Sequence, residues 1–305
     1  MAKVEYQGTG SAHSGTGFRY FRKRSAYLGV IPFFAFTGIF LIYPTLSVVN
    51  GAFHNEDGEY NPKKISELFN SPIYRHAFSN SLEISFKTAF FGAILGGLFA
   101  WALTKGKPGS FFYKFSVALS SVLAQFGGVM LTFAFLATFG FNGFLSTLAM
   151  KHWSSLPIAS PTWLYGLVGL GVVYTFFQIP LMFLVFLPSI ENLRPQWREA
   201  SESLGGSNFE YWVKIAIPIL IPSFLGGTLL LFVNSFSAYA TAAALISQGS
   251  IITPLGIAGA LSSEVGGASA PLAKTLSLLM VTVVLIVMTA YALLRRRVSK
   301  WEQRS

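Results

Sequence analysis

The sequence contains no cysteine and little charge. Asp, Glu, Lys and Arg together make up 11% of its 305 residues, against about a quarter in an ordinary soluble domain. The absence of cysteine excludes a disulfide framework and a thiolate metal site. The shortage of charge excludes an ordinary soluble surface, and 52% of the residues are hydrophobic. A membrane protein is therefore the first interpretation.

The sequence also lacks a phosphate-binding loop. Its nearest approach, TKGKPGS at 104–110, has Pro108 where Ser or Thr should follow the Gly-Lys pair. The four histidines are scattered through the predicted tail and loops, which disfavours a zinc site. No Ser/His/Asp arrangement falls within the apolar runs, so a membrane enzyme has no support. We predict that this chain binds no cofactor itself.

Apolar runs of about 20 residues predict an all-α protein with six membrane-spanning helices. The first run follows a polar tail and a basic cluster. It is too long for the core of a signal peptide, so we expect a retained anchor. The second run carries Glu83 and Lys87 near its outer end. The expected spans are 28–48, 81–104, 115–139, one within 163–190, 219–247 and 275–294.

The fifth run belongs to a longer stretch without charge, from 215 to 263. This length is more than one crossing requires. We predict a turn at 247–250 and a short interfacial or re-entrant piece beside it.

Basic residues give the orientation. Of the 22 Lys and Arg residues, 16 fall in 3–24, 105–114, 194–214 and 295–304. The positive-inside rule places these segments, and both termini, in the cytoplasm. The net charge of +10 is then an orientation signal rather than a nucleic-acid patch. The expected organisation is a flexible cytoplasmic tail at 1–25, the first spanning helix and an outer loop at 26–80, a core of five spanning helices at 81–294 and a basic cytoplasmic tail at 295–305.

The predicted cytoplasmic loop at 194–218 is unusual because it holds three carboxylates between two apolar runs. Pro195 is suited to the first turn of a helix, where its missing N–H is harmless. Trp197, Ala200 and Leu204 then fall on one helical face. The pattern predicts a short helix with an apolar face.

A second helix is predicted to follow immediately. Gly205 and Gly206 end the first helix, since glycine readily adopts the left-handed cap conformation. Ser207 and Glu210 match a capping box. The loop is therefore expected to be helix, glycine elbow, helix. The alternative is an amphipathic hairpin lying on lipid, but glutamates beside the apolar face suit an anionic leaflet poorly.

The loop resembles the EAA loop of permease subunits from binding-protein-dependent ABC importers. The resemblance rests on E-A-S-x-x-x-G, then nine residues and I-x-I-P; the matching positions are Glu199, Ala200, Ser201, Gly205, Ile215, Ile217 and Pro218. Ser201 replaces the family's second Ala, and Ile217 replaces its usual Leu. The preceding YTFFQIPLMFLVFLPSIENLRP resembles the fourth helix of such permeases, and a looser similarity extends over 80–294.

The resemblance implies a type I ABC importer permease fold in the bacterial cytoplasmic membrane. The first loop helix would dock in a separate ATPase subunit, with Ala200 and Leu204 as an apolar wedge and Glu199 paired to a basic residue. Gly205 would let the two loop helices fold back. The residues expected to couple to the ATPase are Glu199, Ala200, Ser201, Leu204, Gly205, Ile215 and Pro218.

The resemblance also implies partners. They are an ATPase dimer that binds ATP and Mg, a second permease subunit expected to be a different chain, an extracytoplasmic solute-binding protein and the lipid bilayer, with no nucleic acid. A self-contained ion-coupled transporter is an alternative. Such transporters usually hold ionisable residues within their spans, and here these are almost absent.

Polar residues within the spans are candidates for the translocation path. They are Gln125, Gln178, Asn234, Ser235, Ser237, Tyr239 and Thr241. The alternative for each is helix–helix packing through small and hydroxyl residues. The stretch 203–207, Ser-Leu-Gly-Gly-Ser, looks more like permeases for polyamines, ferric iron, phosphonates, sulfate or thiamine than like sugar permeases. A polyamine-like solute is therefore the expected cargo, and a sugar or related polyol is the alternative.

Overall fold

The computed structural model describes residues 30–54, 58–107, 109–152, 160–246, 252–262 and 270–302. The tail predicted at 1–25 and the turn predicted at 247–250 lie outside these residues. The chain divides into two units, Met1–Gly51 and Ala52–Ser305. In the first unit, one continuous helix covers Val30–Gly51; it contains the π-helical η1 (Gly38–Ile42) and α2 (Tyr43–Gly51).

The described part of the second unit consists of helices joined by turns and loops, with one isolated β-bridge between His54 and Tyr60. Its helices are α3 (Lys64–Asn70), α4 (Pro72–Thr104), α5 (Phe111–Gln125), α6 (Gly128–Phe139), α7 (Phe144–His152), η3 (Pro161–Tyr165), α8 (Leu167–Glu191), α9 (Pro195–Ser203), α10 (Asn208–Tyr211), η4 (Trp212–Ala216), α11 (Ile217–Phe236), α12 (Ala240–Leu245), α13 (Thr253–Ser262) and α14 (Ala270–Glu302).

Six helical segments are long and apolar enough to cross a membrane, as the sequence predicts. They are Val30–Gly51, Pro72–Thr104, Gly128–His152, Leu167–Glu191, Asn208–Phe236 and Ala270–Leu293. The second begins nine residues before the expected start at 81, and α14 continues to Glu302, into the predicted tail. The chain is therefore built as a multi-pass membrane protein.

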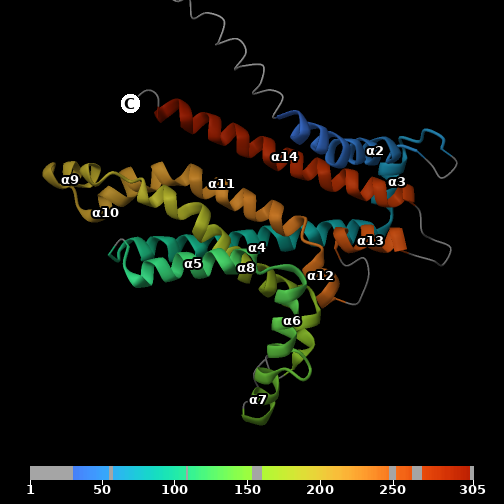
Figure 1. Ribbon diagram of the computed structural model, residues 1–305, viewed down its shortest axis with the longest axis horizontal. Helices are drawn as coiled ribbons and strands as arrows, with labels where there is room; N and C mark the ends of the chain where they lie inside the picture. Colours follow the sequence, from blue (N-terminus) through green and yellow to red (C-terminus); the bar gives the residue numbers. More distant parts are fainter. Residues whose placement is uncertain are drawn as a thin grey trace, which may run out of the picture. The chain divides into compact units, whose positions relative to one another are not determined.

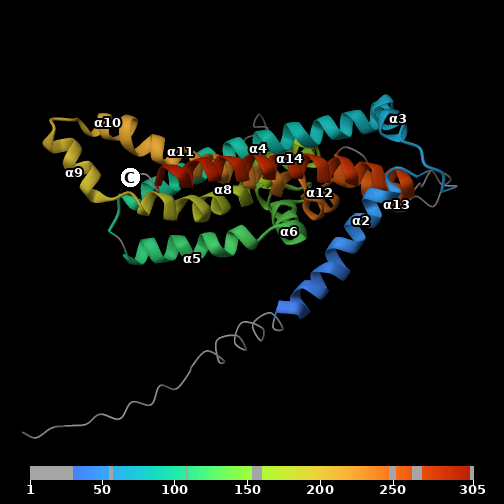
Figure 2. The ribbon, with the colours of Figure 1, turned by 90° about the horizontal axis from the view of Figure 1, so that it is seen from above.

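The long helices α4, α5, α8 and α11 lie side by side, and α6 and α7 leave this bundle at a steep angle (Figure 1). One end of the bundle carries α9 and α10, the start of α5 and the end of α14. The opposite end carries α3 and α13 (Figure 2). The loop at 194–218 therefore projects past one end of the bundle.

Close packing of α4 on α8 forms the centre of the bundle. The buried face of α4 consists largely of Ser, Thr, Ala and Gly. A Cβ atom at Gly92 would lie 2.8 Å from the Cβ of Gln178, and one at Gly96 would lie 2.5 Å from the carbonyl oxygen of Ile179. Gly92 and Gly96 form a GxxxG pattern, which lets two membrane helices approach closely.

The prediction of one continuous third span at 115–139 is wrong. The helix is broken at 126–127, between α5 and α6, and Gly128 has a φ of +68°. Glycine adopts this left-handed conformation without a steric penalty, so the pair Gly127 and Gly128 is the physical cause of the break. A turn at 140–143 separates α6 from α7.

The prediction of a fifth span reaching 247 is also wrong. Helix α11 ends at Phe236, and α12 starts only at Ala240. At this break the Tyr174 hydroxyl donates to the carbonyl oxygen of Ala238 at 2.6 Å. That bond satisfies a backbone oxygen that the break leaves outside a helix. The remaining uncharged length forms the short helices α12 and α13, in agreement with the short piece predicted there.

Candidate coupling loop and translocation path

Helix α9 starts and ends as its sequence predicts. Pro195 occupies the first turn. At the other end, the Gly205 amide donates to the carbonyl oxygen of Glu202 at 3.0 Å, and the Gly206 amide donates to that of Ser201 at 2.9 Å. Gly205 has a φ of +81°. These are the bonds and the conformation of a Schellman cap, which reverses the chain at the end of α9.

The second helix of the loop begins with the predicted capping box. The Ser207 hydroxyl accepts from the Glu210 amide at 3.3 Å, and a Glu210 carboxylate oxygen accepts from the Ser207 amide at 3.1 Å. Helix α10 then continues through the π-helical η4 into α11. Since no loop separates them, the elbow is attached directly to a spanning helix.

The three carboxylates of the loop differ in their partners. Glu202 accepts from Arg198 at 2.9 Å, and Glu210 accepts from Lys214 at 2.8 Å. Glu199 is exposed, and its carboxylate has no hydrogen-bond or ion-pair partner in the described part of the chain. Glu202 and Glu210 are thus paired within the loop, and Glu199 is its one carboxylate without a partner in the described part of the chain.

A hollow of about 690 Å³ lies on the loop, between the end of α9 and the start of α11. Leu204 is 89% exposed, although it is a large aliphatic side chain. The residues that line the hollow are Trp197, Ala200, Ser201, Leu204, Gly205, Gly206, Glu210, Lys214, Ile215 and Ile219. The structure therefore brings together all the predicted coupling residues except Glu199, which is next in sequence to Ala200, and Pro218, which is exposed at the start of α11.

Two of the predicted path residues are buried together between three helices. The Gln178 side-chain amide of α8 donates to the Thr88 hydroxyl of α4 at 3.2 Å. The Thr88 hydroxyl lies 2.8 Å from the Ser235 hydroxyl of α11. Gln178 is 0% exposed, and Thr88 and Ser235 are each 2% exposed. This geometry favours the packing alternative for Gln178 and Ser235, and their place in the path stays a prediction.

The other predicted path residues lie near two helix breaks. Gln125 is exposed at the end of α5, and Ser237 and Tyr239 are exposed between α11 and α12. Asn234 is half-buried just before that break, and Thr241 is buried just after it. The Thr132 hydroxyl of α6 approaches the carbonyl oxygen of Thr241 at 3.2 Å.

The two breaks meet in space. A Cβ atom at Gly128, which follows the first break, would lie 3.6 Å from the Cβ of Ala240, which follows the second. Helix α6 also packs along α12. Broken spanning helices that meet inside a bundle are typical of substrate sites in membrane transporters.

Sequence reasoning missed Thr88 and Tyr174, which join these helices. Thr88 sits in an apolar run with Ser85, where a hydroxyl is an ordinary packing residue. Tyr174 is fully buried and bonds to Ala238. Its signal was weak, because an aromatic ring in a span usually indicates apolar packing. The GxxxG pattern at 92–96 was a usable signal for the approach of α4 to another helix.

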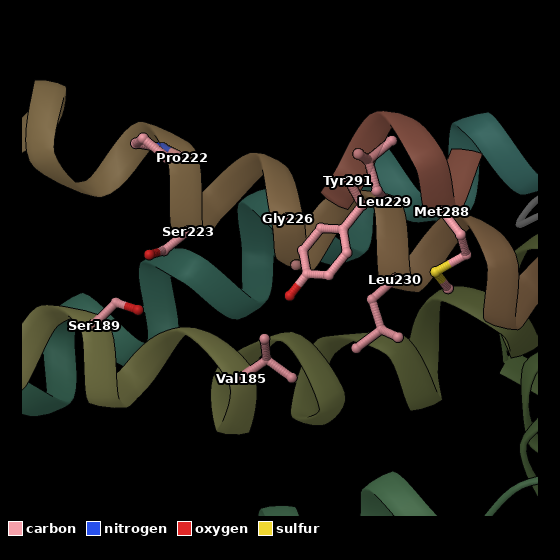
Figure 3. A pocket seen from close by; sticks show the side chains of 10 residues that line it. Val185, Ser189, Pro222, Ser223, Gly226, Leu229, Leu230, Met288 and Tyr291 are labelled. Atoms are coloured by element: carbon pink, nitrogen blue, oxygen red, sulfur yellow. The ribbon is translucent and has the colours of Figure 1, made fainter. Parts of the chain in front are cut away.

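A smaller crevice separates α8, α11 and α14 (Figure 3). Its volume is about 290 Å³, and Tyr291 points into it from α14. A Cβ atom at Gly226 would lie 2.7 Å from the Tyr291 ring, and one at Gly227 would lie 2.7 Å from the sulfur of Met182 on α8. The glycine pair therefore places α11 in close contact with a helix on each side.

Known proteins resemble this chain along part of its length. No family model matches the chain. It is 27% identical to the sulfate transport system permease protein CysT of Escherichia coli K12 over 57% of this chain and 59% of the relative. It is 26% identical to the spermidine/putrescine transport system permease protein PotB of E. coli K12 over 66% of this chain and 74% of the relative. The ferric transport system permease protein FbpB of Actinobacillus pleuropneumoniae is 22% identical over 66% of this chain and 28% of the relative. The chain thus spans less than two thirds of the length of the sulfate and ferric relatives.

Solved structures share the fold. A bacterial ABC transporter involved in the import of the acidic polysaccharide alginate matches with a TM-score of 0.70 and 16% identity, over 92% of this chain and 98% of that chain. The MetNI methionine ABC transporter, in an inward-facing conformation, matches with a TM-score of 0.53 and 17% identity, over 74% and 95%. The chain is therefore a homologue of ABC-transporter permease proteins, and it has the fold of an ABC importer permease.

Proposed function

We propose that this chain is the membrane-spanning permease subunit of an ATP-driven importer in the bacterial cytoplasmic membrane. The observation that carries the proposal is that one loop, which projects past the bundle, carries both the unpaired Glu199 and the exposed Leu204. An unpaired carboxylate and an exposed aliphatic side chain on the same loop fit a partner that supplies a cation and an apolar cleft. The proposed partner is an ATPase subunit, which binds the ATP and Mg; this chain binds no cofactor.

The shape of the loop supports a mechanical role. Closure of an ATPase dimer on ATP would displace α9, and the elbow would pass the displacement through η4 to α11. The spanning helices would then repack between inward-open and outward-open states, with the remote nucleotide biasing one of two arrangements. The proposed sidedness places both termini in the cytoplasm. The end of α14 lies at the same end of the bundle as α9, which supports this placement for the C-terminal segment (Figure 1).

The two helix breaks support a translocation path beside Gln125, Ser237 and Tyr239. These three polar side chains are exposed where the breaks adjoin. We propose that a second permease subunit, a different chain, supplies the opposite wall of the path. An extracytoplasmic solute-binding protein would deliver the cargo.

The proposed cargo is a small polyamine-like solute. A relative named for spermidine and putrescine supports it, and the segment Leu204 to Ser207 resembles that group. The other relatives are named for sulfate and ferric iron, so the cargo is the finer part of the proposal. A sugar or related polyol is the second candidate, and the structural similarity to an alginate importer favours it.

Purification of the tagged chain from its native membrane tests the function. We expect an ATPase, a second permease and a solute-binding protein to co-purify. Hydrolysis of ATP by the complex in liposomes should rise with spermidine and not with sulfate or a neutral sugar. Recovery of the chain without an ATPase would refute the proposal, and stimulation by sulfate or sugar alone would refute only the polyamine.

The pairing of the glutamates gives a matched test of docking. We expect Glu199→Gln to weaken ATPase association about tenfold or more, because truncating one member of a desolvated ion pair costs about 2 to 5 kcal/mol. Glu202→Gln removes the same charge from the same helix, but Glu202 already binds Arg198. An exposed i,i+4 pair contributes only about 0.3 to 0.5 kcal/mol, so this control should bind normally. The affinity of the detergent-solubilised permease for the ATPase is measured for each variant. Equal losses of affinity in Glu199→Gln and Glu202→Gln would contradict the role of Glu199.

A further inference from the structure

The buried hydroxyl of Thr88 is the centre of a polar junction between α4, α8 and α11. Gln178 and Ser235 each have Thr88 as their side-chain partner, and Thr88 also donates to the carbonyl oxygen of Ile84 in its own helix at 2.8 Å. The other polar atom of Gln178, Oε1, has no hydrogen-bond partner in the described structure. The junction therefore depends on one side chain, since removing the Thr88 hydroxyl leaves the Gln178 amide and the Ser235 hydroxyl unpaired.

The junction lies at the far end of the helix that carries the elbow. Ser235 is 18 residues after Ile217, where α11 begins, so the two are separated by about 27 Å along the helix axis. Nearer the elbow, Gly226 and Gly227 bring α11 against Tyr291 and Met182 (Figure 3). Helix α11 is thus held by close packing in its middle and by hydrogen bonds at the end far from the loop.

The two kinds of contact resist different movements. Apolar packing consists of many weak contacts, each about 0.1 to 0.2 kcal/mol per atom pair, and no single one of them is directional. A buried hydrogen bond is directional and costs about 1 to 3 kcal/mol when one partner is left unsatisfied. The polar junction is therefore the contact that fixes the position of α11 along α4 and α8.

We propose that Thr88, Gln178 and Ser235 are positioning residues that make α4, α8 and α11 move as one body when the elbow moves. This inference rests on the proposed function, since it concerns how displacement of the loop reaches the spanning helices. Without the junction, α11 would slide on α4, and ATP hydrolysis would proceed with little transport.

Transport and hydrolysis in the reconstituted wild-type complex and its variants test the junction. The probe is spermidine, or sulfate if sulfate is what stimulates the wild type. We expect Thr88→Val to reduce solute transported per ATP about fivefold or more, the usual lower range of a coupling between sites, with hydrolysis retained. Ser235→Ala should have a smaller effect, because Thr88 keeps Gln178 and Ile84 as partners. Thr88→Ser, which restores the hydroxyl, should transport normally.

A matched control separates positioning from stability. Thr275 is another fully buried threonine, and its hydroxyl approaches the carbonyl oxygen of Ala52 at 3.2 Å. Thr275→Val should leave the transport ratio unchanged even where it lowers the unfolding temperature. An unchanged ratio in Thr88→Val overturns the inference and leaves the proposed function standing. If the wild-type complex contains no ATPase, or if no solute stimulates its hydrolysis of ATP, the inference and the proposed function are both overturned.

A second measurement needs no solute. The chain has no cysteine, so spin labels can be placed at Leu98→Cys on α4 and Leu225→Cys on α11, where both side chains are exposed. We expect the distance between the labels to be the same in the complex without nucleotide and in the complex trapped by adding ATP and vanadate. In Thr88→Val, trapping should shift or broaden it. A shift of equal size in the wild type would overturn the inference.

Discussion

Uptake should be lost when Gly205 is replaced by valine, while the protein stays in the membrane. The backbone at Gly205 has a φ of +81°, and a Cβ atom there would meet nothing within 4 Å. The cost is therefore conformational rather than steric crowding, about 1 to 2 kcal/mol for an L-residue and more for a β-branched one. Valine would restore a negative φ and break the two hydrogen bonds that end α9. Helix α9 would then leave its position beside α10, and the ATPase could no longer bind it.

Gly205→Asn is the control for this prediction. Asparagine tolerates the left-handed conformation better than any β-branched residue, and nothing near the site blocks its side chain. Uptake of labelled solute by intact cells, normalised to the amount of chain in isolated membranes, should be near normal for asparagine and at background for valine. Wild-type uptake by the valine variant would show that the elbow is not required. Glu199→Lys should also abolish uptake, because it reverses the charge offered to the ATPase.

The coupling loop was predictable because its determinants are local. The cap at Gly205 and the capping box of Ser207 and Glu210 depend on residues within five positions of one another, and the structure confirms both. The six spans follow from hydrophobic length, which is also local. Sequence reasoning could not tell which of the three glutamates would remain unpaired, because that depends on where the side chains of Arg198 and Lys214 lie.

The helix breaks and the polar junction depend on contacts between distant residues. Gly127 and Gly128 could have indicated the first break, but glycine also occurs inside membrane helices, as Gly92 and Gly96 show. The second break has no glycine or proline at 237–239, and Tyr174, 64 residues away, bonds to it. Thr88 likewise acquires its partners only when α4 meets α8 and α11. Apolar length predicts that a segment crosses the membrane, but not that its helix is continuous.

Among the glycines of α4, the most damaging substitution should be at Gly96, where α4 meets α8. A Cβ atom there would lie 2.5 Å from the carbonyl oxygen of Ile179 and 2.6 Å from the Cβ of Met182. Backbone atoms and Cβ atoms cannot move aside without moving the helix, so even Gly96→Ala forces α4 and α8 apart. We expect a loss of about 3 kcal/mol, the upper end of the usual cost of overpacking, and larger losses for Gly96→Val. The effect is measured by heating the protein in detergent and recording the fraction that remains monodisperse at each temperature.

Gly171 on α8 provides the matched control, because the same exchange there makes only ordinary van der Waals contacts. Its Cβ would lie 3.9 Å from Thr88 Cγ2 and 4.0 Å from Ile84 Cγ1, which is ordinary contact. Alanine favours a helix over glycine by about 0.8 to 1 kcal/mol, so Gly171→Ala should unfold at the wild-type temperature or above it. If Gly96→Ala were as stable as Gly171→Ala, α4 and α8 could not be packed as closely as described. The junction of Thr88 with Gln178, which that approach permits, would then lose its basis.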